Sequence, residues 1–359
     1  MTMTALDPNS VSQYLTLAAA GDTTGARRMV LGLLDRGVPY SAVIDLLAAA
    51  QHEVGQRWQD DQWTVADEHV VSGVTQRCLD VVASIADADE GAAHVVAACA
   101  EGDWHSLPAQ MFSELLRSRG IEVTDLGGSI PAAHVAEFLD RRHVDALVIT
   151  CSMPLYFAGV TALAVAAHAR GIPVLAGGRA FAGNPQRATA LGADAWTDTL
   201  DSAVEIIHGW YSGETTPALA DVTLNPDALH LHAAAGEIAA EAFTTLQRRL
   251  PVMRDYSPDQ RTRTLEDLVY ITEFTAAARL LNDPPVVEEF IAWLTTVLHR
   301  RGVPVAAVRA GAETLAPIIA RSDPLSARLL SDSLKAAVVP EAALPSQTND
   351  VQGPPVRRQ

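Results

Sequence analysis

Two residues that could do metal chemistry stand two positions apart in the stretch Asp103-Trp104-His105. They follow an apolar run, residues 94–100, that is typical of a buried strand, and they precede a helical pattern. Neutral imidazole is the commonest metal ligand in proteins, and its second ring nitrogen needs a partner that fixes the tautomer. His105 is therefore a candidate metal ligand with Asp103 as its partner. The alternative is a loop histidine that is hydrogen-bonded to a nearby acid.

Small and polar residues end the apolar runs that follow. The third run ends in residues 148–154, VITCSMP, and the fourth in residues 174–181, VLAGGRAF. Paired glycines allow a large ligand to approach the backbone closely. These ends therefore favour a ligand site shared by several strands.

Residues 93–213 must position these side chains, and they alternate between strand and helix patterns. Short runs rich in Val, Ile, Leu and Ala predict strands buried on both faces, at residues 94–100, 122–127, 146–152, 173–178 and 193–198. Helical patterns separate them, at residues 108–119, 131–140, 157–170 and 184–191, with a last one at 200–213. We predict a five-stranded, doubly wound, flavodoxin-like parallel sheet, which binds ligands at the carboxyl ends of its strands.

Helical periodicity marks the chain on both sides of the sheet region. The predicted domains are a four-helix cap at 1–90, the sheet domain at 91–213, a linker at 214–233, a helical domain at 234–338 and a disordered tail at 339–359. The fold class is thus α/β plus all-α.

Composition narrows the function. Of the 359 residues, 26 are basic and 43 acidic, a formal net charge of -17 that argues against direct nucleic-acid binding. The three cysteines lie far apart and suggest neither disulfides nor a zinc site. With no signal peptide and no apolar run of membrane length, we expect a soluble cytoplasmic protein. No hydrolase, P-loop or zincin motif is present, so we do not expect an enzyme.

The sheet region resembles the cobalamin-binding domain shared by B12-dependent methionine synthase, the mutases and corrinoid carriers. Their pattern is D-x-H-x-x-G, then S-x-L or S-x-T, then G-G. The resemblance implies that His105 is the lower axial cobalt ligand and Asp103 its partner. It also implies that a slot for the nucleotide tail is lined by Thr150, Ser152, Gly177, Gly178 and Phe181. The motif glycine is replaced by Pro108, which can open a helix but lacks an N–H.

The helical cap resembles that of the CarH-type light-dependent B12 photoreceptors. Their Trp-x9-Glu-His signature corresponds to Trp58, Glu68 and His69. This resemblance implies that the three side chains lie over the adenosyl group of adenosylcobalamin. The alternative is a core tryptophan and a solvated Glu-His pair. The family has a histidine directly after the tryptophan as the upper cobalt ligand after photolysis, and this chain has Gln59 there. His69, His52 or water are the alternatives.

The last helical block resembles a globin-like or phycobiliprotein-like domain, as in photocobilins, which add a bilin to the B12 chromophore. A bilin such as biliverdin needs arginines for its propionates and an acid or histidine near its pyrrole nitrogens. Candidates are Arg261, Arg263, Asp267, Tyr270, Trp293, His299, Arg300 and Arg301. No cysteine follows Cys151, so a bilin in this block would be held non-covalently. Haem on His299 and a dimerisation bundle without a ligand are the alternatives.

Taken together, the resemblances imply a non-enzymatic light sensor that uses adenosylcobalamin and a bilin. Light-driven Co–C cleavage would change the conformation, the homo-oligomer (a dimer or larger) or the binding of a downstream protein. Two other functions stay open. One is a corrinoid methyl carrier of a methyltransferase system, and the other is a light-independent B12-responsive antirepressor that acts by protein contact.

Overall fold

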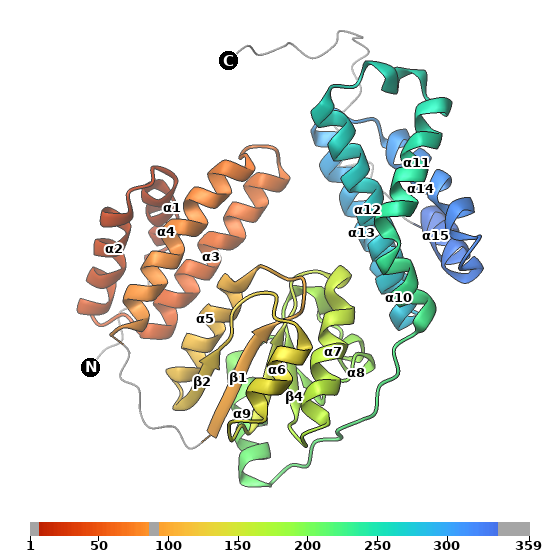
Figure 1. Ribbon diagram of the computed structural model, residues 1–359. Helices are drawn as coiled ribbons and strands as arrows, with labels where there is room; N and C mark the ends of the chain where they lie inside the picture. Colours follow the sequence, from red (N-terminus) through yellow and green to blue (C-terminus); the bar gives the residue numbers. More distant parts are fainter. Residues whose placement is uncertain (1–6, 86–92, 337–359) are drawn as a thin grey trace.

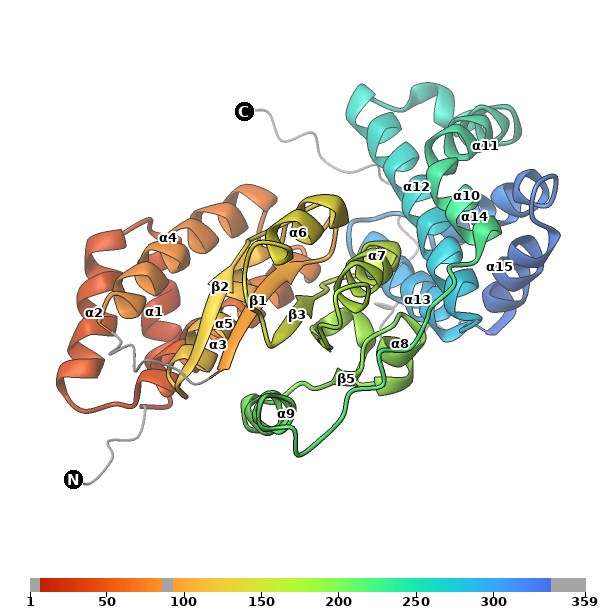
Figure 2. The same cartoon turned by 60° about the horizontal axis from the view of Figure 1, so that its bottom comes forward.

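The molecule has three parts in a row, with a parallel sheet in the middle (Figures 1 and 2). The computed structural model describes residues 7–85 and 93–336, so the predicted tail at 339–359 lies outside the described residues. A helical cap lies on one side of the sheet and a larger helical domain on the other. The predicted fold class, α/β plus all-α, is confirmed.

The cap is a bundle of four helices, as predicted. They are α1 Ser10–Ala19, α2 Thr23–Asp35, α3 Tyr40–Gln59 and α4 Val65–Ala83. A capping box starts α4, because the Thr64 hydroxyl accepts from the Asp67 N–H while the Asp67 carboxylate accepts from the Thr64 N–H. Tyr14 lies fully buried in the middle and donates to the Thr75 hydroxyl at 3.0 Å. These contacts fix the direction of α4, which carries two of the predicted ligand residues.

The sheet has five parallel strands in the order β2-β1-β3-β4-β5. The strands are β1 Ala93–Cys99, β2 Ile121–Asp125, β3 Ala146–Thr150, β4 Val174–Gly177 and β5 Ala195–Trp196. This order is that of flavodoxin-like folds, and its switch point lies between β1 and β3. The predicted sheet is therefore confirmed, and residues 101–106 and 151–153 meet at its ligand-binding edge.

Helices cover both faces of the sheet. On one face, α5 Ser106–Arg117 and α9 Leu200–Ser212 contribute Leu116, Ala203 and Ile207 to a core with the strands. The other face carries α6 Ala132–Leu139, α7 Phe157–His168 and α8 Pro185–Ala190. Continuous burial of β1 and β3 explains why these strands have no polar alternation.

The C-terminal domain consists of six α-helices among the described residues. They are α10 Pro226–Ala233, α11 Ala235–Arg249, α12 Pro258–Leu281, α13 Pro285–Arg300, α14 Val305–Ile319 and α15 Pro324–Ala336. Short 3-10 turns lie at Pro154–Tyr156 (η1), Arg179–Phe181 (η2) and Pro251–Asp255 (η3).

The predicted linker, residues 214–233, is wrong in its second half, where α10 begins at Pro226. Asn225 caps this helix by accepting from the N–H groups of Asp227 and Ala228 at 3.0 and 3.3 Å. Proline is tolerated in the first helical turn, so Pro226 supports the helix instead of ending it. Ala228 and Leu231 are buried, which ties α10 to the domain that follows.

One continuous hydrophobic core joins the sheet domain to the C-terminal domain. It runs from the α7 face of the sheet, through Leu155 and Phe157, into the interior of α11 to α15. A buried guanidinium reinforces this junction, since Arg187 of α8 bonds Asp283 at 2.7 Å and Glu289 at 3.3 Å. The cap has a separate core that reaches the sheet domain through α5, where Met111 is buried. The two helical parts are therefore attached to the sheet in different ways.

None of the helices in the described residues has a long enough apolar stretch to cross a membrane.

Candidate functional site

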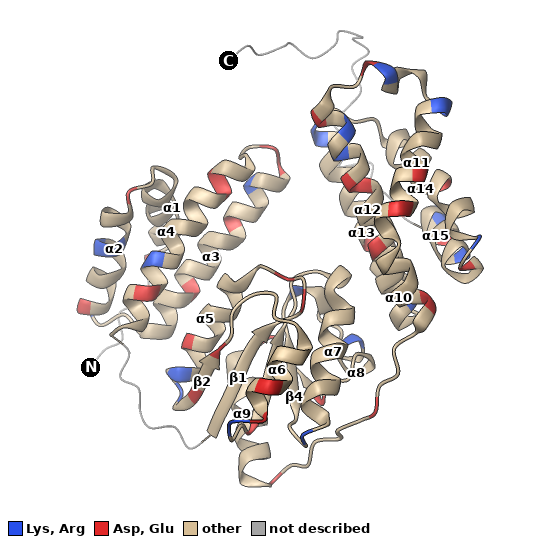
Figure 3. Ribbon diagram, in the orientation of Figure 1, with Lys and Arg blue, Asp and Glu red and all other residues tan. Residues whose placement is uncertain are grey.

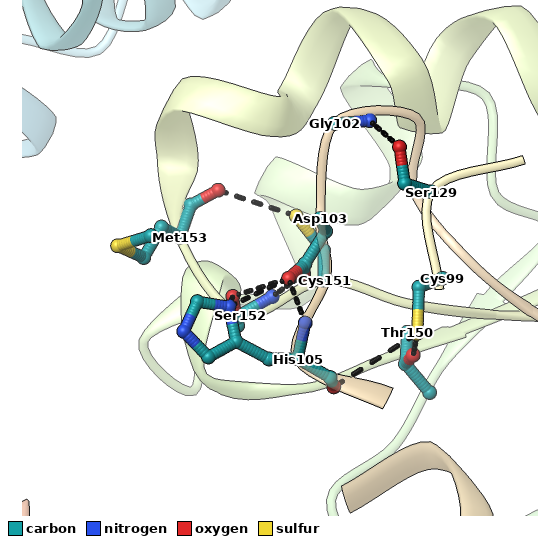
Figure 4. Close-up of polar contacts among 9 residues, drawn as sticks. All are labelled: Cys99, Gly102, Asp103, His105, Ser129, Thr150, Cys151, Ser152 and Met153. Atoms are coloured by element: carbon teal, nitrogen blue, oxygen red, sulfur yellow. Dashed lines mark hydrogen bonds and ion pairs between the residues drawn. The ribbon is translucent and has the colours of Figure 1, made fainter. Parts of the chain in front are cut away.

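Asp103 and His105 occupy the turn between β1 and α5, and Figure 4 shows their polar contacts. Nδ1 of His105 lies 2.9 Å from Oδ1 of Asp103, and the His105 N–H donates to the same oxygen at 3.0 Å. His105 is also the residue that precedes the first turn of α5. The motif is therefore built locally, with helix start, loop and ligand candidate in one short segment.

Asp103 is a buried carboxylate whose two oxygens both accept hydrogen bonds. Its Oδ2 accepts from the Ser152 N–H at 2.7 Å, and its Oδ1 accepts from the Ser152 hydroxyl at 2.9 Å. Burial opposes ionisation, but these bonds and those from His105 together lower the pKa of Asp103. An ionised, buried and fully bonded carboxylate is a rigid acceptor for an imidazole N–H.

His105 presents its second ring nitrogen away from these partners (Figure 4). Because Asp103 is ionised, Nδ1 carries the proton and Nε2 carries the lone pair. The hydrogen bond to Asp103 raises the pKa of His105; burial opposes this shift, and the charges of Asp103 and of Glu68 in the cap add to it. The side chain is 53% exposed, so Nε2 can be reached from the sheet edge.

Thr150 and Ser152 end β3 beside this pair. Ser152 bonds Asp103 as described, and its hydroxyl lies 3.1 Å from Nδ1 of His105. Thr150 turns its hydroxyl toward Sγ of Cys99 at 3.4 Å, and that thiol contacts the His105 carbonyl oxygen. Burial raises the pKa of Cys99 to about 11, so this thiol is protonated and acts as a packing group. Ser152 therefore belongs to the bonded site, and Thr150 supports it.

The two glycines that end β4 approach β3 and β5 closely. Gly178 has φ +107°, and a Cβ there would lie 2.4 Å from the Cys151 carbonyl oxygen. At Gly177 a Cβ would lie 3.2 Å from the Thr197 carbonyl oxygen. Only glycine fits at position 178 without strain. The loop backbone therefore comes as near to β3 as a backbone can.

The prediction that Phe181 lines the slot is wrong. Its side chain is fully buried and lies against Phe157, with the ring centroids 5.7 Å apart. Because residues 179–181 form a 3-10 turn, Phe181 points into the core under α7. A single large apolar residue after a glycine pair is therefore a core residue here.

Pro108, which replaces the glycine of the motif, is compatible with helix α5. It lies in the first turn of α5, which begins at Ser106, two residues before the predicted start. The first N–H groups of a helix have no partner within the helix, so a proline here costs no hydrogen bond. The side chain is exposed. The substitution of the motif glycine leaves the His105 loop intact.

The cap brings Glu68 of α4 near His105, whose pKa its charge raises. His69 is exposed, and its Nδ1 lies 2.7 Å from the Val65 carbonyl oxygen of its own helix, so it bonds backbone. Trp58 lies in the last turn of α3 and stacks on Trp293 of α13, with centroids 6.3 Å apart and planes at 23°. Gln59, the last residue of α3, follows it half-buried. The structure thus brings Glu68 to the site, whereas Trp58 contacts Trp293 of the C-terminal domain.

The predicted bilin residues lie along α12 and α13. The guanidinium of Arg261 already donates hydrogen bonds to the backbone carbonyl oxygens of Tyr256 and Arg254, at 3.1 and 3.0 Å. Arg300 pairs with Asp60 of the cap. Tyr270 and Trp293 are 43% and 38% exposed, which is unusual for rings of this size.

Two polar groups in this domain have unusual surroundings. Burial raises the pKa of Asp267 to about 6; Glu266 adds to this shift, while Arg263 and Arg301 oppose it. Within the described residues, Nε2 of His299 is buried and has no hydrogen-bond partner. Buried polar atoms of this kind are rare in folded proteins and indicate a missing partner.

Tyr156 and Glu273 were not predicted: Tyr156 lies against the loop that carries His105, and Glu273 lies on α12 of the C-terminal domain. The Tyr156 ring covers Gly102, where a Cβ would lie 3.0 Å from its Cδ1. Burial raises the pKa of Tyr156 to about 12, and the charges of Asp103, Tyr270 and Glu273 add to the shift. The signal in the sequence is an aromatic residue in the segment between β3 and α7; Glu273 has none.

The donor set at His105 fits a metal that brings its own ligands. Among the residues that the structure describes, no group of three or more His, Cys, Asp or Glu side chains could hold an ion. One imidazole with a carboxylate partner is a single axial ligand. A corrin supplies the equatorial nitrogens itself, so the observed site suits a cobalt corrin.

Comparisons with known proteins agree with this geometry. Residues 93–207 match a family model described as B12 binding domain, and residues 11–83 match a second model of the same description. Among curated proteins, the search found no match.

Solved structures with related folds were found as well. The monomethylamine corrinoid protein of Methanosarcina barkeri is 17% identical with a TM-score of 0.49, covering 56% of this chain and 98% of that protein. The methanol:cobalamin methyltransferase complex MtaBC of the same organism is 19% identical, with a TM-score of 0.33 and coverage of 60% and 84%. A cobalamin-binding protein of Desulfitobacterium hafniense DCB-2 is 19% identical, with a TM-score of 0.32 and coverage of 57% and 99%.

The sheet-edge histidine and the two matched segments lead to one conclusion: the chain carries cobalamin-binding domains over residues 11–83 and 93–207, and its cofactor is a cobalamin.

Proposed function

We propose that the chain is a light sensor whose cofactor is adenosylcobalamin. The observation that supports this most is the position of Glu68, whose charge reaches His105 across the space between cap and sheet. A corrin held by His105 would have the cap residues Trp58 and Glu68 over its upper side. An indole offers a flat surface to a nucleoside, and a carboxylate accepts hydrogen bonds from its hydroxyl groups.

When bound, adenosylcobalamin supplies a cobalt–carbon bond that light breaks. The chain's own residues do the rest. Asp103 and Ser152 hold His105 in one tautomer and one orientation, and Glu68 with Trp58 retains the upper group in the dark. Loss of that group leaves the cap without one of its contacts, so the cap moves relative to the sheet. This local trigger makes the cap the two-state element.

A bilin in the C-terminal domain is the second part of the proposal. Asp267 is a buried carboxyl that a pyrrole N–H array would stabilise in its charged form, and Arg263 and Arg301 lie near it. Nε2 of His299 is a buried atom in need of a partner. Arg261 and Arg300 are already bonded and are weaker candidates for the propionates. Haem on His299 is the alternative ligand.

The output is proposed to be a change in oligomer or in binding of a protein partner, with no catalysis. Figure 3 shows both basic and acidic residues along the helices of the cap and around the sheet. The net charge of -17 argues against direct nucleic-acid binding. We propose a cytoplasmic homo-oligomer that acts through protein contact.

A corrinoid methyl carrier is the second candidate. The observation that favours it is the state of Trp58, which Trp293 and the Arg301 guanidinium already contact. An indole occupied in this way leaves more room for a methyl group than for a nucleoside. A light-independent antirepressor would differ from the sensor only in the role of light.

Ligand preference and light response test these alternatives. The protein is mixed with adenosylcobalamin and biliverdin, desalted in the dark and then illuminated with red light, which cobalamin hardly absorbs. A retained far-red band with conversion of the cobalamin bands supports the two-pigment sensor. Tighter binding of methylcobalamin than of adenosylcobalamin supports the carrier. Loss of cobalamin on desalting would contradict both functions.

A further inference from the structure

The C-terminal domain holds the cap tryptophan from outside the cap. The guanidinium of Arg301 lies 4.7 Å from the centroid of the Trp58 ring, and its Nη2 donates to the Trp58 carbonyl oxygen at 2.9 Å. Trp293 stacks on the same indole. One arginine thus contacts both the backbone and the ring of Trp58, and it comes from a segment 243 residues away.

Arg301 and its neighbour Arg300 also hold the turn that follows Trp58. Arg301 Nε lies 3.5 Å from Asp61, and Arg300 pairs with Asp60. Asp61 has φ +59°, a left-handed conformation that is uncommon for a residue other than glycine. Arg300 bonds Asp60 in the turn, whereas Arg301 contacts both the turn and the indole.

Behind the indole, the contacts continue into the C-terminal core. Trp293 lies 5.9 Å from Phe290, and Phe290 stacks on Phe274 at 3.8 Å with planes at 10°. Phe290 and Phe274 are buried in the core shared with the sheet domain. The position of Trp58 is therefore fixed by contacts with the C-terminal core as well as by the cap.

We infer that Arg301 is a positioning residue for the upper side of the cobalamin site, which the C-terminal domain completes by fixing Trp58. The inference rests on the proposed function, because it assigns Trp58 to the upper ligand. Coupling of this kind is reciprocal: anything bound beside Asp267 and Arg301 changes the affinity for the upper ligand, and the upper ligand changes that affinity in turn. Arg301 serves because its planar fork can cover a ring and donate at the same time.

The test measures dissociation constants in the dark for adenosylcobalamin and methylcobalamin. We compare Arg301→Gln, Arg301→Lys and Arg300→Gln with the parent chain. For Arg301→Gln, adenosylcobalamin affinity is expected to fall about 2- to 30-fold, the range of a cation–π contact. Methylcobalamin affinity is expected to change less than about 2-fold. Arg301→Lys recovers only part of the loss. Arg300→Gln, which removes a contact with the turn at Asp60 and leaves the Arg301 contact with the indole, gives a smaller loss than Arg301→Gln.

A second readout uses the ligand-free protein. Near-ultraviolet circular dichroism reports the stacked pair of indoles, and its signal should decrease in Arg301→Gln and in Trp293→Leu while the far-ultraviolet spectrum is unchanged. Equal loss of affinity for both cobalamins, or no loss for either, would overturn the inference. Failure of the proposed function is seen separately, in a parent chain that does not prefer adenosylcobalamin.

Discussion

The proposed lower and upper sides of the cobalamin site are built in opposite ways. On the lower side, Asp103, His105 and Ser152 bond one another within two loops at one sheet edge. On the upper side, Glu68 comes from α4, Trp58 from α3, and the groups that hold Trp58 come from α13 and the residue after it. The first arrangement is local and tightly bonded, whereas the second depends on how three domains meet. Changes on the lower side should therefore have larger and more uniform effects.

His105→Ala should give the largest effect. It removes the proposed cobalt ligand, and since even the partner of a metal ligand is worth 10- to 100-fold, we expect at least about 100-fold weaker binding. Equilibrium dialysis with hydroxocobalamin measures it. His134→Ala, on the exposed face of α6, is the control. Unchanged affinity in His105→Ala would show that cobalamin binds without this ligand.

Asp103→Asn should weaken the same binding by about 10- to 100-fold. The amide keeps the shape but cannot accept from both Ser152 and His105 as the carboxylate does. Glu101→Gln, an exposed change in the same loop, should leave affinity unchanged. Thermal unfolding of the ligand-free variants separates lost binding from lost stability. Equal affinities of the two variants would contradict the role of Asp103.

Gly178→Ala should destabilise the protein by about 1–3 kcal/mol. Its Cβ would lie 2.4 Å from the Cys151 carbonyl oxygen, so β3 and the β4 loop must separate. Gly183→Ala is the matched control, because Gly183 also has a positive φ but nothing within 4 Å of a Cβ. Urea unfolding gives both values. Equal costs would mean that φ, and not the contact with Cys151, requires the glycine.

Asp267→Asn should give the smallest of the four effects, and it tests the C-terminal domain, whose Arg301 contacts Trp58. The pKa of Asp267 is raised to about 6, so its contribution to stability is present below the unfolded value and is lost as pH rises through about 6. Relative to the parent, the variant should gain about 1–2 kcal/mol in the free energy of unfolding between pH 4 and pH 8. Urea unfolding at both pH values checks this.

A pH-independent difference between Asp267→Asn and the parent would show that the carboxyl is solvated. Glu205→Gln, an exposed change on α9 away from Asp267, is the control.

Most of the sheet and the lower side could be predicted because their signals are local. Apolar runs of strand length and the turn residues after them lie next to each other in the sequence, and five strands with their helices followed. The Asp103–His105 contact spans two residues, so a short motif contains it.

The upper side could be predicted only as a list of residues. Nothing near Trp58 in the sequence indicates that Trp293 and Arg301 contact it, because these contacts depend on domain placement. The same limit applies to α10, which packs against the C-terminal domain, and to Phe181, which is buried because of the 3-10 turn in which it lies. Neither the helix α10 nor the burial of Phe181 can be predicted from neighbouring residues in the sequence.

The continuous core described above decides how this protein can be divided. A C-terminal domain joined to its neighbour by a linker could be removed or exchanged, but here removal of α11 to α15 would uncover the apolar side of the sheet domain as well. The sheet and the C-terminal helices are one folding unit, and the cap, with its own core, is the appended one. In the proposed sensor the moving element is therefore the amino-terminal cap, and the sheet with the carboxyl-terminal helices is the body against which the cap moves.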